Sequence, residues 1–154
     1  MAHIDFLEHH PEHLETVAGW IYDEWTHVTE PDLQTQIERT RGWLNHDRIP
    51  LCLVALEGSR CLGTVSIFVH DLPDRHDLTP WLAALYVDAS ARRRGVGEAL
   101  MDRLLEVARD LGIGRLYLHT ETAAPFYRKR GWRYLFRCLN DRGEETDVFD
   151  RELR

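Results

Sequence analysis

The stretch Ala91-Arg92-Arg93-Arg94-Gly95-Val96-Gly97-Glu98 joins an apolar run, residues 81–87, to an amphipathic run, residues 99–111. This order predicts a strand, a short loop and a helix. The first N–H groups of a helix lack internal partners and carry partial positive charge from the helix dipole. The two glycines let an anion approach the main chain, and the three arginines add donors for it. The stretch therefore predicts a loop that binds a diphosphate.

The glycine pattern of this loop differs from two common nucleotide-binding motifs. No Lys-Ser or Lys-Thr pair follows a glycine, as a P-loop requires, and the third glycine of a dinucleotide fingerprint is absent. Glycine-rich turns between a strand and a helix also occur as plain connections. The loop alone leaves both interpretations open.

Length and composition indicate a single globular domain over residues 1–154. Hydrophobic residues make up 44% of the chain and charged residues 29%, which is ordinary for a soluble domain. The formal net charge of −7 argues against nucleic acid or an anionic membrane as the main partner. The same charge slightly favours cationic substrates.

Cysteine usage and the apolar runs point to a cytoplasmic protein without a metal site. Cys52, Cys61 and Cys138 form an odd set without C-x-x-C spacing, so neither a disulfide framework nor a zinc site is indicated. The first residues lack the pattern of a signal peptide, and no apolar run approaches the ~18 residues of a membrane span. Four histidines lack tight metal-ligand spacing and are interpreted as surface residues: His3, His9, His10 and His13.

Hydrophobic periodicity predicts a mixed α/β (α+β) domain in the order β-α-α-β-β-β-α-β-α-β-β. The first helix is expected to start at Pro11, and Thr122 is expected to cap the last one. The expected strands are residues 4–7, 51–56, 60–69, 81–87, 115–119, 132–138 and 145–149. The expected helices are residues 11–25, 31–41, 99–111 and 123–130.

A second motif lies one predicted helix and one predicted strand beyond the loop. It reads Phe126-Tyr127-Arg128-Lys129-Arg130-Gly131-Trp132. The two motifs in this order resemble the coenzyme A loop and the aromatic-Tyr signature of the GNAT superfamily of N-acetyltransferases. The resemblance implies a splayed mixed sheet flanked by helices, with acetyl-CoA in the gap. It also implies direct transfer of the acetyl group to a primary amine in a ternary complex.

The resemblance also implies which residues contact acetyl-CoA. Backbone groups at the end of the central strand would face the pantetheine, and the amides of residues 93–98 would hold the diphosphate. Thr120 stands where many members carry an Asn that contacts the pantetheine arm, so this contact is in doubt. The implied cofactor residues are Leu85, Tyr86, Val87, Arg92, Arg93, Arg94, Gly95, Val96, Gly97, Glu98, Thr120, Ala123, Phe126 and Tyr127.

Acetyl transfer requires a neutral amine and a proton for the departing thiolate. We expect Tyr127 to be the general acid, because a phenol keeps its proton at neutral pH. The alternative is that Tyr127 only packs, with its hydroxyl bonded to backbone or cofactor. The proton acceptor is open, since residues 81–87 contain no Glu. The candidates are His119, Asp71, Glu24 and Tyr86, with Asp71 also able to bind the amine.

The sequence favours an enzyme that acetylates a small cationic amine. One alternative is an acetyltransferase for peptide N-termini, and another is a non-catalytic sensor that binds acyl-CoA without needing Tyr127. Substrate specificity is expected to come from the first two helices and residues 70–80. Pairing of two copies through the C-terminal strands, giving a homodimer, stays as a further expectation.

Overall fold

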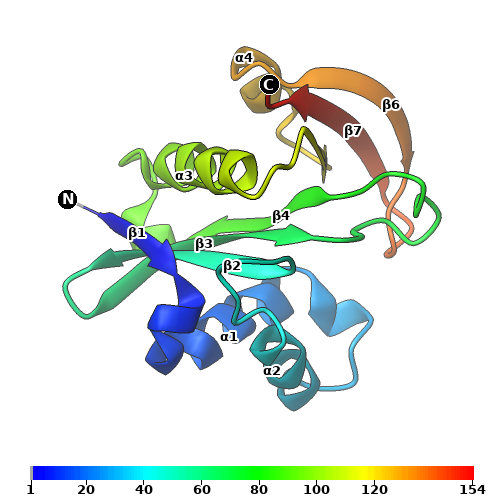
Figure 1. The fold of residues 1–154 in the computed structure, drawn as a ribbon. Helices are drawn as coiled ribbons and strands as arrows, with labels where there is room; N and C mark the ends of the chain where they lie inside the picture. The colour runs from blue at the N-terminus through cyan, green and yellow to red at the C-terminus, as the bar shows by residue number, and fades with distance from the viewer. Residues whose placement is uncertain (1) are drawn as a thin grey trace.

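Seven strands form one mixed sheet, and the computed structural model describes residues 2–154 of the chain. The strand order is β1-β2-β3-β4-β5-β7-β6 (Figure 1). All neighbours pair antiparallel except β4 and β5, which are parallel. The strands are β1 (His3–Phe6), β2 (Leu51–Glu57), β3 (Arg60–Phe68), β4 (Trp81–Val87), β5 (Arg115–Thr120), β6 (Arg133–Leu139) and β7 (Glu145–Glu152).

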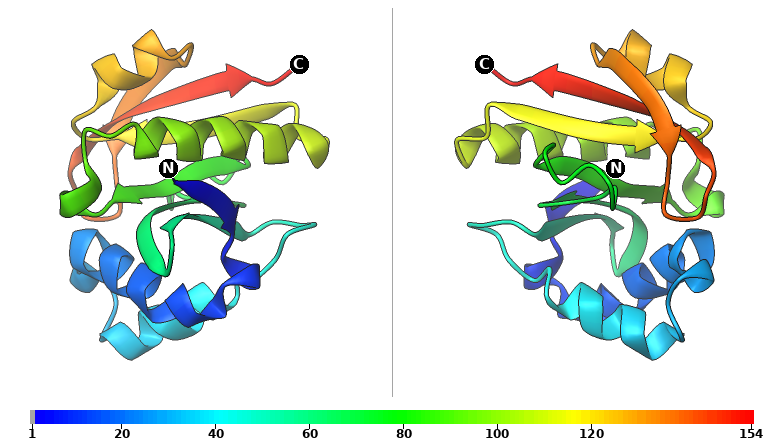
Figure 2. Two further views of the ribbon diagram at one scale, coloured as in Figure 1. Left: turned by 90° about the vertical axis from the view of Figure 1, so that its left-hand side faces the viewer. Right: turned by 90° about the vertical axis from the view of Figure 1, so that its right-hand side faces the viewer.

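Helices cover both faces of the sheet (Figures 1 and 2). The longest, α3 (Val96–Asp110), lies on one face, while α1 (Leu14–Glu24) and α2 (Leu33–Arg41) lie on the other. The short helix α4 (Ala124–Lys129) packs near β6 and β7. Four 3-10 turns complete the set: η1 (Leu7–His9), η2 (Pro11–His13), η3 (Thr26–Val28) and η4 (Ala89–Ala91).

Strand β2 shows why a strand inside the sheet can be apolar almost throughout. Leu51, Leu53 and Ala55 belong to the core on the α3 side. The intervening Cys52 and Val54 belong to the core beneath α1 and α2. Because side chains alternate between the two faces and both faces are covered, the first six residues of the strand are all buried.

The sheet opens between β4 and β5. Only Trp81 and Tyr117 form a register pair between these strands, whereas β4 pairs with β3 along its length. A β-bulge accompanies the opening, since Tyr86 and Ala83 pair with Thr64 and Ser66 and leave two residues opposite one. Ala84, in the bulge, has a φ of 54°, a conformation that is strained for a residue with a Cβ. The C-terminal half of β4 therefore has an unpaired edge that faces the gap between β4 and β5.

The predicted order of elements is confirmed, and the differences lie at their ends. Pro11 begins the turn η2 instead of helix α1, which starts three residues later at Leu14. The cap predicted at Thr122 is wrong, because the amide of Ala123 donates to Thr120 Oγ1 at 3.0 Å. None of the helices within residues 2–154 is long and apolar enough to cross a membrane.

Candidate active site

A groove of about 570 Å³ lies between the unpaired edge of β4, the start of α3 and helix α4. Its lining holds most of the residues implied for acetyl-CoA, drawn from all three elements. The exceptions are Tyr86, Arg94 and Thr120, which lie outside it. The opening of the sheet is what brings residues around 85, 96 and 126 together.

The start of α3 supplies the polar wall of this groove. Gly95 is the N-cap residue with a φ of 78° and provides no side-chain cap. The first helical bond is Ala99 N–H to Gly95 O, at 3.1 Å, and among residues 2–154 the amides of residues 96–98 donate to no carbonyl. A Cβ on Gly97 would meet only Val87 Cγ2, at 3.7 Å. Protein packing therefore leaves free both the amides and the space that an anion needs.

The three arginines of the loop differ in their surroundings. Arg92 donates from Nε to Val87 O at 3.0 Å, and its guanidinium lies 5.5 Å from the centre of the Tyr86 ring. Arg94 is turned away and pairs with Glu57 at 2.7 Å, so the donor role predicted for it is not supported. Arg93 lines the groove and has no ion-pair partner within residues 2–154. It is therefore available to bind a phosphate.

Tyr86 belongs to the opposite face of the sheet. Side chains alternate along β4, so Leu85 and Val87 line the groove while Tyr86 packs beneath α1. Its ring lies 5.4 Å from that of Trp20 and 6.4 Å from that of Trp25. This placement argues against both roles considered for Tyr86, cofactor contact and proton acceptor.

A second, larger cavity of about 830 Å³ adjoins the groove. Its walls come from the end of α1, from α2, from residues 70–76, from β4, from the end of β5 and from the turn between β6 and β7. Leu85, Thr122, Ala123 and Tyr127 line both spaces. A molecule in the groove and a molecule in the cavity would therefore meet at Tyr127.

The Tyr127 ring is buried among aromatic side chains. It packs edge-on against Phe126 and Trp132, with ring centres 5.1 and 6.4 Å away. Its hydroxyl makes no hydrogen bond to any group of residues 2–154, so the alternative of a hydroxyl bonded to backbone is not what the structure shows. Burial, with a smaller contribution from the charge of Glu121, raises the pKa of Tyr127 to about 12. The phenol thus carries its proton throughout the neutral range.

His119 is held between two carboxylates at the floor of the larger cavity. Nε2 lies 3.0 Å from Asp71 Oδ2, and Nδ1 lies 3.1 Å from Glu121 Oε2 and 2.9 Å from Thr146 Oγ1. Burial disfavours the imidazolium, but the hydrogen bonds to Asp71 and Glu121 outweigh burial and raise the pKa of His119 to about 9. Although burial alone would raise the pKa of Glu121, its bonds to His119 and Thr146 lower it to about 2.

This network changes the roles predicted for His119 and Asp71. A histidine that is already protonated at neutral pH cannot accept a proton from the amine, so the structure does not support His119 as the base. Asp71 is occupied as its counter-ion. The ion pair of His119 with Asp71 instead connects residues 70–80 to the end of β5. Glu121 connects the same network to Arg142 in the β6–β7 turn, at 3.4 Å. No spacing along the chain indicates this network, because its members are brought together only by the fold.

Glu24 is the remaining candidate among the acidic residues considered for the amine. It lies at the C-terminal end of α1 and lines the larger cavity. Within the described residues its carboxylate has no hydrogen bond and no ion pair. Two acids in and beside the β6–β7 turn are paired, Glu144 to Arg142 at 2.7 Å and Asp147, in β7, to Arg137 at 3.0 Å.

Known proteins share both the sequence pattern and the architecture. Residues 14–132 match the model of the acetyltransferase (GNAT) family. N-acetyltransferase 8 of Homo sapiens is 29% identical over 114 residues, which are 71% of this chain and 50% of that protein. The chain thus spans about half the length of this curated relative.

Solved structures with the same fold cover nearly the whole chain. An aminoglycoside 6'-N-acetyltransferase complexed with coenzyme A has a TM-score of 0.77 at 14% identity, over 99% of this chain and 97% of that one. Ard1 from Thermoplasma volcanium has a TM-score of 0.71 at 21% identity, over 98% and 97%. From its sequence match, the chain belongs to the acetyltransferase (GNAT) family.

Proposed function

We propose that the protein transfers the acetyl group of acetyl-CoA to a primary amine of a small cationic molecule. The observation that carries the proposal is the meeting of two spaces at Tyr127: a groove with free helix-start amides, and a larger cavity rich in carboxylates. The first fits an acyl carrier with a diphosphate, and the second fits an acceptor with positive charge. Both reactants would be bound at once, which direct transfer requires.

Coenzyme A would occupy the groove with its diphosphate at the start of α3. The free amides of residues 96–98 and the unpaired Arg93 would bind the anion. The pantetheine would run along the unpaired edge of β4, past Leu85 and Val87, toward Tyr127. The thioester would then lie where the groove opens into the cavity.

The chemistry needs one proton donor at the sulfur. The neutral amine attacks the thioester carbonyl carbon, a C–N bond forms and the C–S bond breaks. Tyr127 donates its proton to the departing thiolate and regains one when the nitrogen of the product loses its extra proton. Binding both partners in reacting positions supplies a further share of the rate. No residue is assigned as an obligatory base, since the amine can lose its first proton to water before it attacks.

The larger cavity favours a cation. Its five carboxylates outnumber the two arginines and the His119 imidazolium. One of the arginines, Arg39, is neutralised by Glu30 at 2.5 Å. We assign the binding of a substrate ammonium group to Glu24, whose carboxylate is unpaired and exposed.

A thiol-release assay with acetyl-CoA tests this function. The amine panel should contain a polyamine, an aminoglycoside, a neutral primary amine and peptides with free N-termini. Acetyl transfer is expected to be fastest with the multiply charged amines. Faster reaction with peptides would favour acetylation of peptide N-termini, and coenzyme binding without release across the panel would favour a sensor.

A further inference from the structure

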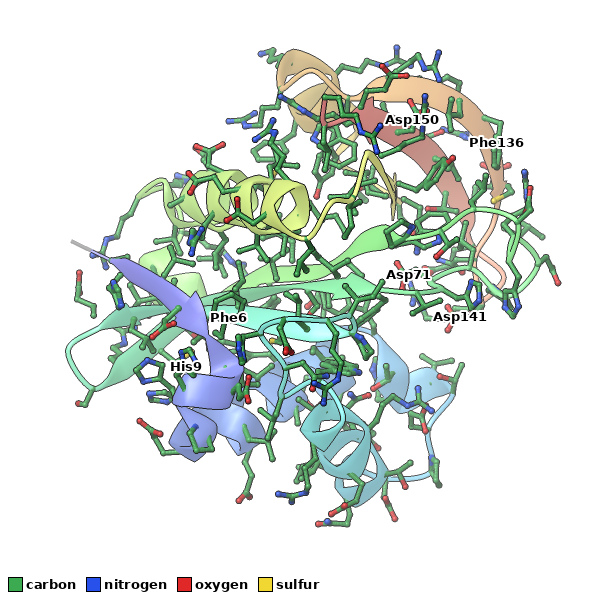
Figure 3. The ribbon with its side chains drawn as sticks, in the orientation of Figure 1. Phe6, His9, Asp71, Phe136, Asp141 and Asp150 are labelled. Carbon is green, nitrogen blue, oxygen red and sulfur yellow. The ribbon has the colours of Figure 1, made fainter. Side chains whose placement is uncertain are left out.

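A cluster of metal-ligating side chains lies outside both the groove and the larger cavity. It consists of Glu8 and His9, on the turn η1, and His46, in the segment between α2 and β2. Figure 3 shows His9 beside β1, far from Asp71 and Asp141 at the cavity. None of the three residues lines the groove or the cavity. The proposed acetyl transfer leaves this cluster without a role.

The three side chains converge although they are distant in sequence. One ligand atom of each lies within 4.8 Å of the other two. His46 Nδ1 lies 2.7 Å from Glu8 Oε1, a contact that bridges 38 positions of the chain. Donor atoms around a tetrahedral Zn²⁺ are about 3.3 Å apart, so no separation among the three ligand atoms has to change by more than about 1.5 Å.

Asp5 orients His9 as a carboxylate orients the histidines of metal sites. Nδ1 of His9 lies 3.2 Å from Asp5 Oδ1. Because a carboxylate only accepts hydrogen bonds, the neutral ring carries its hydrogen on Nδ1 and leaves the lone pair of Nε2 for a metal ion. This is the pairing that fixes the tautomer and ring direction of a metal-bound histidine. Asp5 also binds His10 Nε2 at 2.9 Å, which holds the carboxylate itself in place.

Phe6 restricts the two rings further. Its ring packs edge-on against His9, with ring centres 5.6 Å apart, and against His46, with ring centres 6.1 Å apart. The two imidazoles are therefore held near each other by an apolar neighbour and not only by their polar contacts. This arrangement reduces the side-chain entropy that metal binding would otherwise cost.

We propose that Glu8, His9 and His46 bind one divalent transition-metal ion, for which Zn²⁺ is the probe. Two imidazole nitrogens and one carboxylate oxygen are a ligand set that Zn²⁺ accepts, with water in the fourth position. Mg²⁺ and Ca²⁺ prefer sites made of oxygen ligands alone. The ion would take the position of the hydrogen that joins Glu8 to His46. It would tie η1 to the segment that precedes β2, and so act on stability rather than on catalysis.

Zn²⁺ binding to the metal-free protein tests the proposal. Titration by calorimetry is expected to show one site, and Zn²⁺ but not Mg²⁺ should raise the melting temperature. His46→Gln and Glu8→Gln should each weaken Zn²⁺ binding at least about 30-fold, as expected for the loss of a ligand. Asp5→Asn should weaken it about 10- to 100-fold, the usual cost of losing such an orienting carboxylate. The visible spectrum of the Co²⁺ form should indicate four-coordinate geometry.

The matched control is His13→Gln, the same change at a nearby histidine outside the cluster. It should leave Zn²⁺ binding unchanged. Coenzyme A binding by every variant reports whether the variant is folded, since the cluster lies away from the groove. Equal Zn²⁺ affinity in wild type, His46→Gln and Glu8→Gln would overturn the proposal, as would no Zn²⁺ binding by the wild type.

Discussion

The groove and the larger cavity are built by different means, although they share Tyr127. The groove is lined by one loop, the helix start that follows it with its free amides, a strand edge left open by the bulge, and helix α4. The cavity is formed by charged and aromatic side chains from six segments spread between residues 21 and 144. The groove is thus suited to one constant ligand, whereas the cavity can change its acceptor by single substitutions.

Tyr127→Phe tests the junction of the two spaces and should have the largest effect. Loss of the proton donor is expected to lower kcat about 10²- to 10⁴-fold. The KM for acetyl-CoA should change little, because the ring that packs with Phe126 and Trp132 is kept. Steady-state kinetics with a saturating amine measures both values. An unchanged kcat would remove the catalytic role of Tyr127.

His119 gives the cavity a stability that depends on pH. Since the folded-state pKa of His119 is raised from 6.5 to about 9, its contribution is complete below pH 6.5 and is lost as the pH rises through 9. The loss should be on the order of 3 kcal/mol in the free energy of unfolding. Urea unfolding at several pH values measures it.

His119→Gln should remove most of this pH dependence and lower stability at pH 6.5. The control is His13→Gln, which should keep the wild-type pH profile. The same profile in wild type and His119→Gln would show that the ties to Asp71 and Glu121 do not hold the cavity together.

Gly97→Ala tests the main-chain character of the groove. The added Cβ meets only Val87 Cγ2 at 3.7 Å, so the fold should tolerate it. It would occupy space needed by the diphosphate and should raise the KM for acetyl-CoA about tenfold. Gly63→Ala is the contrasting variant, because its Cβ would lie 2.8 Å from Tyr86 O and should destabilise the fold instead. An unchanged KM in Gly97→Ala would place the diphosphate elsewhere.

Glu24→Gln tests the side-chain character of the cavity and should have the smallest effect. Because the carboxylate is exposed, its loss should raise the KM for a cationic amine about fivefold and leave the KM for acetyl-CoA unchanged. Asp23→Asn is the matched control, an exposed acid on the same helix that does not line the cavity. Equal KM values in the two variants would argue that Glu24 does not bind the amine.

The difference between the groove and the cavity also explains how much of each can be predicted from sequence. The loop at residues 91–98 and the periodic apolar runs carry their information locally, so the order of elements and most groove residues were predicted. The directions of the Arg94 and Tyr86 side chains could not be predicted in this way. Arg94 is turned by its ion pair with Glu57, and Tyr86 lies on the face of β4 that packs against α1.

The cavity was predicted least well, because its contacts join distant segments. The position of His119 at a strand end predicts a base, whereas its protonation follows from Asp71 and Glu121, which the fold brings to either side of the ring. The convergence of Glu8, His9 and His46 is of the same kind. Spacing along the chain cannot show a cluster whose third member is 38 positions away from the first.

A crystal structure of the protein with coenzyme A would show directly where the diphosphate and the sulfur bind. We expect the diphosphate at the amides of residues 96–98 and the sulfur within hydrogen-bonding distance of the Tyr127 hydroxyl. A coenzyme bound with its sulfur away from Tyr127, or with its diphosphate outside the groove, would contradict this expectation.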